Sequence, residues 1–416
     1  MSVLRTNRFQ RPREKSLICR MNRHILTPPE ARKIILHAAG LHKRAPFGKG
    51  REAVYKCIDH LGFIQIDTNY VVERAHHQAI YTRVPDYKPQ WLAELQTDGR
   101  IFEYVTYASG YLPMQDYRFT LPVKESFLAK RSDLPAAEIN ILHKVLDRVT
   151  RDGPLMARDF ENDRVGISTG WWDWRPSKIA LERLYLDGRL MTTHQDDFQK
   201  LFDLPQNIVP IDTDKTTPSP EEYARHIIRR VLKALGIALQ KDISFRTRYI
   251  KHDVKTQLQK LIETGEVVEV AVEGVKTPPL YMLSSYKRKK IELAGDTFIV
   301  SPFDMLNVLR HRLRLFFDFD YQVECFVPAP ARKYGYFSHP ILVGDTFVAR
   351  MDAKADRKSK ELNVLNLHFE PGKRTMAMLD KLSTAIQDFA IFNQCHSISL
   401  QRSNDRSALK TLRMRV

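Results

Sequence analysis

Three segments of this 416-residue chain repeat one local pattern, and this repeat constrains the fold more than any other feature. Aligned on a glycine, the segments are YKCIDHLG (55–62), LERLYLDG (181–188) and LQKLIETG (258–265). Apolar residues stand seven and four positions before each glycine, so they share one helix face, and the glycine is typical of a left-handed helix stop. A strand-like run follows each one: FIQIDTNYVV, RLMTT and EVVEVAV. A single helix–glycine–strand segment is common in proteins, but three of them, spaced by roughly the length of a small domain, favour repeated winged helices. In a winged helix, one helix docks in the major groove of DNA and the strands form the wing.

Neighbouring segments complete the three modules. In the second copy we predict helices over 138–149 and 175–187, a short strand and helix at GPLMARDF, and a wing at HQDD. In the third copy we predict a helix over 220–235 and a hairpin from EVVEVAV to PLYML. The first copy starts with the helix LTPPEARKIILHAAGL, with Thr27 as its cap and Pro28 in its first turn.

The character of the sequence changes after about residue 291, where short aromatic or β-branched runs alternate with turn signals. We predict a mixed α+β protein in which tandem winged-helix modules precede a small, β-rich, barrel-like unit with a hairpin turn at Gly344–Asp345 and a closing helix over 376–392. The expected boundaries are a basic, disordered N-terminal arm (1–24), winged-helix modules (25–132, 133–215, 216–290), the β-rich unit with its closing helix (291–400) and a basic tail without a clear core face (401–416).

The charge balance points to a polyanionic partner. The chain has 66 Lys+Arg against 49 Asp+Glu, a net charge of +17, which favours nucleic acid or an anionic membrane face. The first 51 residues hold 13 Lys/Arg against two Glu and so carry +11 of this charge. We therefore expect a mildly basic body and an N-terminal arm that acts as a salt-sensitive DNA anchor.

Several protein classes are excluded. No window approaches the roughly 20 apolar residues of a membrane span, and the N-terminal charges are not followed by the apolar core of a secretory signal. The four cysteines lie far apart, without the Cys/His spacing of a zinc site. We expect a bacterial cytoplasmic, nucleoid-associated monomer without membrane contact, metal or cofactor.

The densest polar cluster on apolar strands lies in GFIQIDTNYVVERAHHQAIYTRV (62–84). On a strand, Gln65 and Asp67 would share one face, about 6–7 Å apart. A carboxylate can activate water or face a developing cation, and an amide can hold that water. The alternative is a half-exposed strand with outward polar residues, which the pattern alone favours.

His76 and His77 are adjacent and would face different ways, and no metal motif completes a site, so contact with phosphate is the better hypothesis.

Basic residues elsewhere are candidates for phosphate contacts. In GWWDWRPSK, Arg175 and Lys178 flank the start of the second module's third helix. Such charge runs are most often solvated, but the net charge and the repeated winged helices make a phosphate-contacting rim a fair hypothesis. Together with the residues of the polar cluster, the candidate DNA contacts are Asn69, Arg74, His76, His77, Tyr107, Arg175, Lys178, Arg310, Arg312, Arg332, Lys333, Arg357 and Lys358.

Long, ordered motifs from about residue 25 to 392 resemble the YcaQ-type crosslink-repair DNA glycosylases. They include GFIQIDTNYVVERAHHQAIYTRVPDY, GPLMARDFE, GWWDWRPSKIALERLYLDGRLM, SPFDMLNVLRHRLRLFFDFDY, VPAPARKYGYF and ARMDAKADRKSKELNVLNLHFEPG. The resemblance implies a concave DNA-binding surface and hydrolysis of the N-glycosidic bond of alkylated purines, including those that join two strands. The family's Gln–apolar–Asp motif falls on Gln65, Ile66 and Asp67. The resemblance therefore favours a catalytic role for Gln65 and Asp67 over a half-exposed, purely structural strand. A sister group has a second Gln at the position of Asp67.

The resemblance also implies a mechanism. Asp67 would stabilise an oxocarbenium-like sugar and position or deprotonate water, and Gln65 would orient that water. The motif has no lysine to form an imine, so a monofunctional glycosylase with a wide, open cleft is expected. One departure is Tyr107, which stands in a segment where the family often has His. The main alternative is a winged-helix transcriptional regulator without enzymatic activity; a nuclease and a structural DNA-coating protein are weaker.

Overall fold

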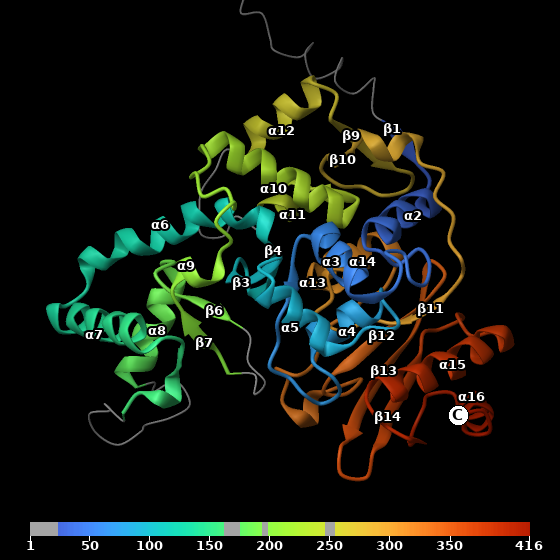
Figure 1. The fold of residues 1–416 in the computed structure, drawn as a ribbon. Coiled ribbons are helices and arrows are strands. Elements are labelled where there is room, and N and C mark those ends of the chain that lie inside the picture. Colours follow the sequence, from blue (N-terminus) through green and yellow to red (C-terminus); the bar gives the residue numbers. More distant parts are fainter. Residues whose placement is uncertain (1–23, 162–174, 194–198, 246–253) are drawn as a thin grey trace, which may run out of the picture.

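The computed structural model describes residues 24–161, 175–193, 199–245 and 254–416 (Figure 1). Most of the expected basic arm (1–24), the GWWDW segment and the expected wing at HQDD lie outside these ranges. The described part is a mixed α+β structure with four sheets. No described helix is long and apolar enough to cross a membrane.

The first helix–glycine–strand unit forms as the spacing predicted. Thr27 and Glu30 form the capping box of α2, and α3 ends at Gly62, whose φ of 66° is left-handed. Strands β2, β4 and β3 form a three-stranded antiparallel sheet in that order. The elements of this part are α2 (Pro28–Ala38), α3 (Gly50–Leu61), β2 (Ile64–Gln65), α4 (Ala75–Tyr81), α5 (Pro89–Thr97), β3 (Ile101–Val105) and β4 (Ser109–Pro113).

The second unit has a smaller sheet, β5-β7-β6, and projects to one side of the molecule in Figure 1. Both long predicted helices are present as α7 and α8, and Gly188 is left-handed (φ 78°). The helix predicted in GPLMARDF is only a 3-10 turn. The elements are η1 (Met114–Thr120), α6 (Leu121–Ala129), η2 (Lys130–Asp133), α7 (Ala136–Asp152), β5 (Leu155–Met156), η3 (Ala157–Asp159), α8 (Pro176–Leu186), β6 (Met191–Thr193), β7 (Leu201–Asp203) and α9 (Pro205–Ile208).

The third unit contains the predicted helix and hairpin, and Gly265 is left-handed (φ 73°). Its sheet also contains a strand from the other end of the chain, because β1 pairs in parallel with β9 and places Ile25 opposite Ala271. Ile25 and Leu26, which the sequence assigned to the first module, thus belong to a strand that completes the sheet of the third. The elements are β1 (His24–Leu26), α10 (Pro220–Leu235), β8 (Ile237–Leu239), α11 (Gln240–Ser244), α12 (Val254–Glu263), β9 (Val267–Val272), β10 (Leu280–Leu283) and η5 (Ser284–Arg288).

The C-terminal part is a curled, five-stranded half-barrel with the order β11-β12-β13-β14-β15. The turn at Gly344–Asp345 and the closing helix α15 confirm their predictions, but the sheet is open, since β11 and β15 are its edges. The elements are β11 (Thr297–Ile299), α13 (Met305–Val308), α14 (Arg310–Phe317), η6 (Ala329–Ala331), β12 (Ser338–Val343), β13 (Thr346–Asp356), β14 (Glu361–Phe369), α15 (Met376–Phe392), β15 (Ser397–Leu400) and α16 (Arg406–Arg413).

The prediction of a basic tail over 401–416 was wrong. Asp405 caps α16, and this helix buries Ala408, Leu409 and Leu412 in the same core as the half-barrel. Three apolar residues at i, i+1 and i+4 suffice for a narrow core face, while the basic residues between them stay outward.

A buried ion pair joins α4 to the C-terminal part. The Arg83 guanidinium donates two hydrogen bonds to the Asp304 carboxylate, at 2.7 and 2.9 Å, and both side chains are fully buried. Gln78, one turn earlier, donates from Nε2 to the carbonyl of Ile299 at 3.2 Å. These contacts position the segment before α4, which carries Gln65 and Asp67, against the loops of the half-barrel.

Candidate active site

Gln65 lies at the end of a short strand whose backbone is fixed by its neighbour. It pairs with Gly110 of β4, and the N–H of Ile66 donates to the carbonyl of Ser109 at 2.9 Å. Position 110 requires glycine, because a Cβ there would lie 2.4 Å from the ring of Phe63. The Gln65 side chain is half-buried at this point.

Asp67 lies beyond the strand, which differs from the predicted long strand FIQIDTNYVV. The strand ends at Gln65 because the Asp67 carboxylate accepts the N–H of Asn69 at 2.8 Å, an Asx turn that redirects the chain. The alternation of side chains along a strand therefore does not decide whether Gln65 and Asp67 point the same way, because only Gln65 lies on the strand. The Asx turn instead holds one carboxylate oxygen in place while the side chain stays half-buried.

A loop of the C-terminal part lies against this turn. The Tyr336 hydroxyl donates to Asn69 Oδ1 at 3.2 Å, and the Arg332 guanidinium lies 4.9 Å from the Tyr336 ring centre. Burial raises the pKa of the Cys325 thiol, and the charge of Asp67 raises it further. Residues more than 250 positions apart in the chain thus lie together at this candidate site. The Gln–apolar–Asp motif by itself does not indicate that a C-terminal loop takes part.

Two arginines enclose the ring of Tyr70 beside the turn. The guanidinium carbon of Arg357 lies 3.4 Å from the ring centre, and that of Arg74 lies 4.6 Å from it. Arg74 Nη1 also donates to the carbonyl of Thr68 at 2.9 Å, and Arg357 Nη2 donates to the carbonyl of Val72 at 3.0 Å. Two predicted DNA contacts are therefore brought together, and they join the turn between β13 and β14 to the segment that carries Gln65 and Asp67.

The two histidines of α4 have different environments. His76 is buried, and burial lowers its pKa well below the usual value, so the prediction that it contacts DNA was wrong. His77 is half-buried, with Nδ1 2.6 Å from the Tyr87 hydroxyl. Tyr107 is also half-buried: its hydroxyl donates to Met305 Sδ at 3.4 Å, and its ring packs on Phe63.

Two predicted phosphate contacts bind the protein itself. Arg312 is 3% exposed and donates to the carbonyls of Leu235 and Ile237, so its prediction as a DNA contact was wrong. Arg175, the N-cap of α8, is half-buried and donates to the carbonyls of Ala157 and Phe160. In a sequence, such arginines look like surface charges, since nothing local shows which carbonyls they reach.

The remaining basic candidates lie at or near the surface. Lys178 is half-buried on α8, in the lobe of α7 and α8 in Figure 1. Arg310 is exposed at the start of α14, Lys333 lies over the Tyr334 ring, and Lys358 is exposed in the turn between β13 and β14. The described residues contain no group of three or more His, Cys, Asp or Glu side chains placed to hold a metal ion.

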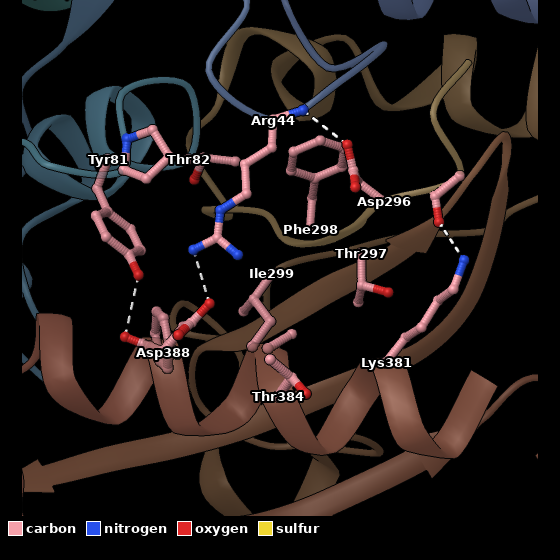
Figure 2. A pocket seen from close by; sticks show the side chains of 14 residues that line it. Arg44, Tyr81, Thr82, Asp296, Thr297, Phe298, Ile299, Lys381, Thr384 and Asp388 are labelled. Atoms are coloured by element: carbon pink, nitrogen blue, oxygen red, sulfur yellow. Dashed lines mark hydrogen bonds and ion pairs between the residues drawn. The ribbon is translucent and has the colours of Figure 1, made fainter. Parts of the chain in front are cut away.

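A cavity of about 250 Å³ lies elsewhere, between α15, β11 and the segment around Arg44 (Figure 2). Its charged groups bond within the protein: Arg44 contacts Asp388 at 2.7 Å and its backbone N–H donates to Asp296 at 2.7 Å, while Lys381 donates to the carbonyl of Gly295 at 2.8 Å. Neither Gln65 nor Asp67 lines this cavity or a second one beside Phe63 and Tyr104. We therefore treat the cavity in Figure 2 as part of a structural interface.

Comparisons with known proteins agree with this architecture. A family model described as DNA glycosylase AlkZ-like matches residues 58–392. Among solved structures, the chain is similar to Streptomyces sahachiroi DNA glycosylase AlkZ, with a TM-score of 0.60 and 15% sequence identity, over 91% of this chain and 99% of that chain. At this identity the structural likeness shows a shared fold, while the family match covers both Gln65 and Asp67.

Proposed function

Because the chain belongs to the AlkZ-like DNA glycosylase family, we propose that it hydrolyses the N-glycosidic bond of cationic alkylated purines in duplex DNA. Its substrates include purines that join the two strands, which it unhooks without cleaving the backbone. The observation that carries this proposal is that Gln65 at the end of β2 and Asp67 in the Asx turn just beyond it are half-buried, where Tyr336 of the loop with Arg332 bonds Asn69 of the same turn.

The chemistry needs few protein groups, because a cationic purine is already a good leaving group. As the bond breaks, positive charge develops on the sugar, and the Asp67 carboxylate stabilises that charge. The same carboxylate accepts a proton from the attacking water, and the Gln65 amide orients that water by donating and accepting hydrogen bonds. Residues 64–69 contain no lysine that could form a covalent imine, which supports a monofunctional reaction.

DNA binding in this proposal uses the three helix–strand units as tandem winged helices along a concave surface, which the C-terminal half-barrel part completes. Phosphate contacts come from Arg310, Arg332, Lys333, Arg357 and Lys358, together with Lys178 on α8. Asn69, Arg74 and His77 lie beside Asp67 in the chain and act near the lesion. Asp67 lines neither of the two cavities described above, which suits a crosslinked base, because such a base remains tied to the opposite strand and cannot enter a closed pocket.

The decisive experiment compares Asp67→Asn with wild type. Wild type should release 7-methylguanine from methylated duplex and should leave alkali-labile abasic sites at a nitrogen-mustard crosslink. Asp67→Asn should lower this release by a factor on the order of 100 or more and keep DNA affinity, because the amide neither carries the negative charge nor accepts the proton.

Asp212→Asn is the matched control, because Asp212 is an exposed carboxylate after α9, and it should behave like wild type. Full excision by Asp67→Asn would contradict the assignment of Asp67. Tight binding of one DNA sequence by wild type, without release of any base, would instead indicate a transcriptional regulator.

A further inference from the structure

Phe326 presents an apolar ring to solvent beside the candidate site. The residue is 81% exposed, against 44% for Tyr70. Leaving a Phe side chain in water forgoes the favourable free energy of burying it. A single exposed apolar residue needs no explanation by itself, so it is the position of this ring beside functional groups that indicates a binding role.

The loop around Phe326 is held in place by a buried carboxylate. Glu324 is 8% exposed and accepts three backbone hydrogen bonds, from the N–H groups of Lys333, Tyr334 and Gly335 at 3.1, 2.8 and 3.0 Å. The N–H of Val327 donates to the carbonyl of Glu324 at 3.0 Å, and Arg332 Nε donates to the carbonyl of Val327 at 2.8 Å. The residues on both sides of Phe326 are thus anchored, so the ring is displayed on a fixed loop.

The same loop contacts the catalytic segment. Tyr336 donates to Asn69, the partner of Asp67 in the Asx turn. Cys325, directly before Phe326, lies within the electrostatic reach of Asp67 and also of Arg332. The exposed ring therefore stands at the edge of the site, among cations that suit a phosphate backbone.

We propose that Phe326 is a positioning residue that inserts between base pairs next to the lesion and unstacks the duplex. This inference rests on the proposed function at Asp67. Stacked base pairs keep the glycosidic bond away from a side chain on a protein surface, and apolar wedges that part a base step are a common means of exposing it. A phenyl ring stacks on any base, so the wedge would act independently of sequence.

The surroundings favour DNA over a protein partner. Arg332 and Lys333 belong to the loop, the charge of Arg310 reaches Cys325 next to Phe326, and the described carboxylate within the loop, Glu324, is buried and engaged by backbone N–H groups. A net positive rim around one aromatic ring is complementary to phosphates on both sides of a base step.

A kinetic experiment tests the wedge through the difference between duplex and single-stranded DNA. Under single-turnover conditions, Phe326→Ala should slow 7-methylguanine release from a duplex by roughly 10-fold to 100-fold, the range expected for losing one base–aromatic stack. Release from the same strand without its complement should change by less than about threefold, because no stacked pair has to be opened. Phe326→Trp should keep the duplex rate, and Ile211→Ala is the control for an exposed apolar side chain outside the site.

A second measurement needs no base release. A duplex with 2-aminopurine beside a tetrahydrofuran abasic analogue should gain fluorescence when wild type binds, and this gain should be absent with Phe326→Ala. If wild type releases no base, the proposed function fails, but the fluorescence comparison still decides for or against the wedge.

Three results would overturn the inference. The first is an equal loss of rate on duplex and single strand, and the second is an unchanged fluorescence gain with Phe326→Ala. The third is a concentration-dependent dimer of wild type, seen by sedimentation, that Phe326→Ala abolishes, because the ring would then bind a second copy of the chain.

Discussion

The buried pair of Arg83 and Asp304 allows a quantitative prediction about stability. Arg83 makes two hydrogen bonds to Asp304 and also donates to the carbonyls of Ala39 and Ala79, at 2.7 and 2.8 Å. Asp304 in turn accepts the N–H of Leu306 at 3.0 Å and caps α13. Both side chains are fully buried, so water cannot replace either partner.

Replacing Arg83 with Met leaves the Asp304 carboxylate without its counter-charge and two carbonyls without their donor. The expected loss in the free energy of unfolding is about 3–5 kcal/mol, a large part of the roughly 5–15 kcal/mol that stabilises a typical domain. Replacing both residues, as Arg83→Met with Asp304→Leu, removes both buried charges and should cost less than the two single changes added together.

Urea denaturation followed by tryptophan fluorescence measures these losses. Arg44→Met is the matched control, since Arg44 and Asp388 form an ion pair of the same length, 2.7 Å, with side chains 54% and 32% exposed (Figure 2). That pair should be worth less than about 1 kcal/mol. A loss for Arg83→Met as small as for Arg44→Met, or a double variant as unstable as the sum of the singles, would refute the reasoning.

Two further predictions concern pH and salt. Burial lowers the pKa of His60 and His339 from 6.5 to about 4, so unfolding takes up protons between these values and stability falls as the pH falls through that window. The urea midpoint should therefore be lower at about pH 5 than at about pH 7, and an unchanged midpoint would contradict the neutral state of these histidines. Arg312→Met should lower the free energy of unfolding by on the order of 3 kcal/mol and should leave the salt dependence of DNA binding unchanged. Arg357→Met should instead reduce the slope of log affinity against log salt concentration by about 1. Equal salt slopes for the two variants would show that Arg357 does not contact phosphate.

Local signals predicted much of the fold. Each stop glycine and the apolar residues before it act within about two helix turns, so the positions of α3, α8 and α12 could be read from the sequence. The Gly344–Asp345 turn and α15 were predictable for the same reason. The tail was misjudged because α16 has only a narrow apolar face, and its partner, the core of the half-barrel, is formed by distant segments.

The candidate site was predictable only in its centre. Gln65 and Asp67 were identified through the family motif, while Tyr70 was passed over although it stands in the same segment. Tyr336 belongs to VPAPARKYGYF, another motif of the resemblance, but its contact with Asn69 spans 267 positions. His76 and Arg312 were misassigned because a polar side chain in a sequence carries no sign of whether tertiary packing will bury it.

The amino-acid sequence alone determined the helix–glycine–strand units, the composition of the half-barrel strands and the Gln–apolar–Asp motif, because these depend on residues close together in the chain. The tertiary structure decided that β1 joins the sheet of β9 and that Arg357 joins Arg74 around the ring of Tyr70. The tertiary structure also decided which arginine and lysine side chains are exposed and which are bound within the protein. Such outcomes depend on packing between segments hundreds of residues apart, where burial and hydrogen bonding select among pairings that the local sequence leaves equally open.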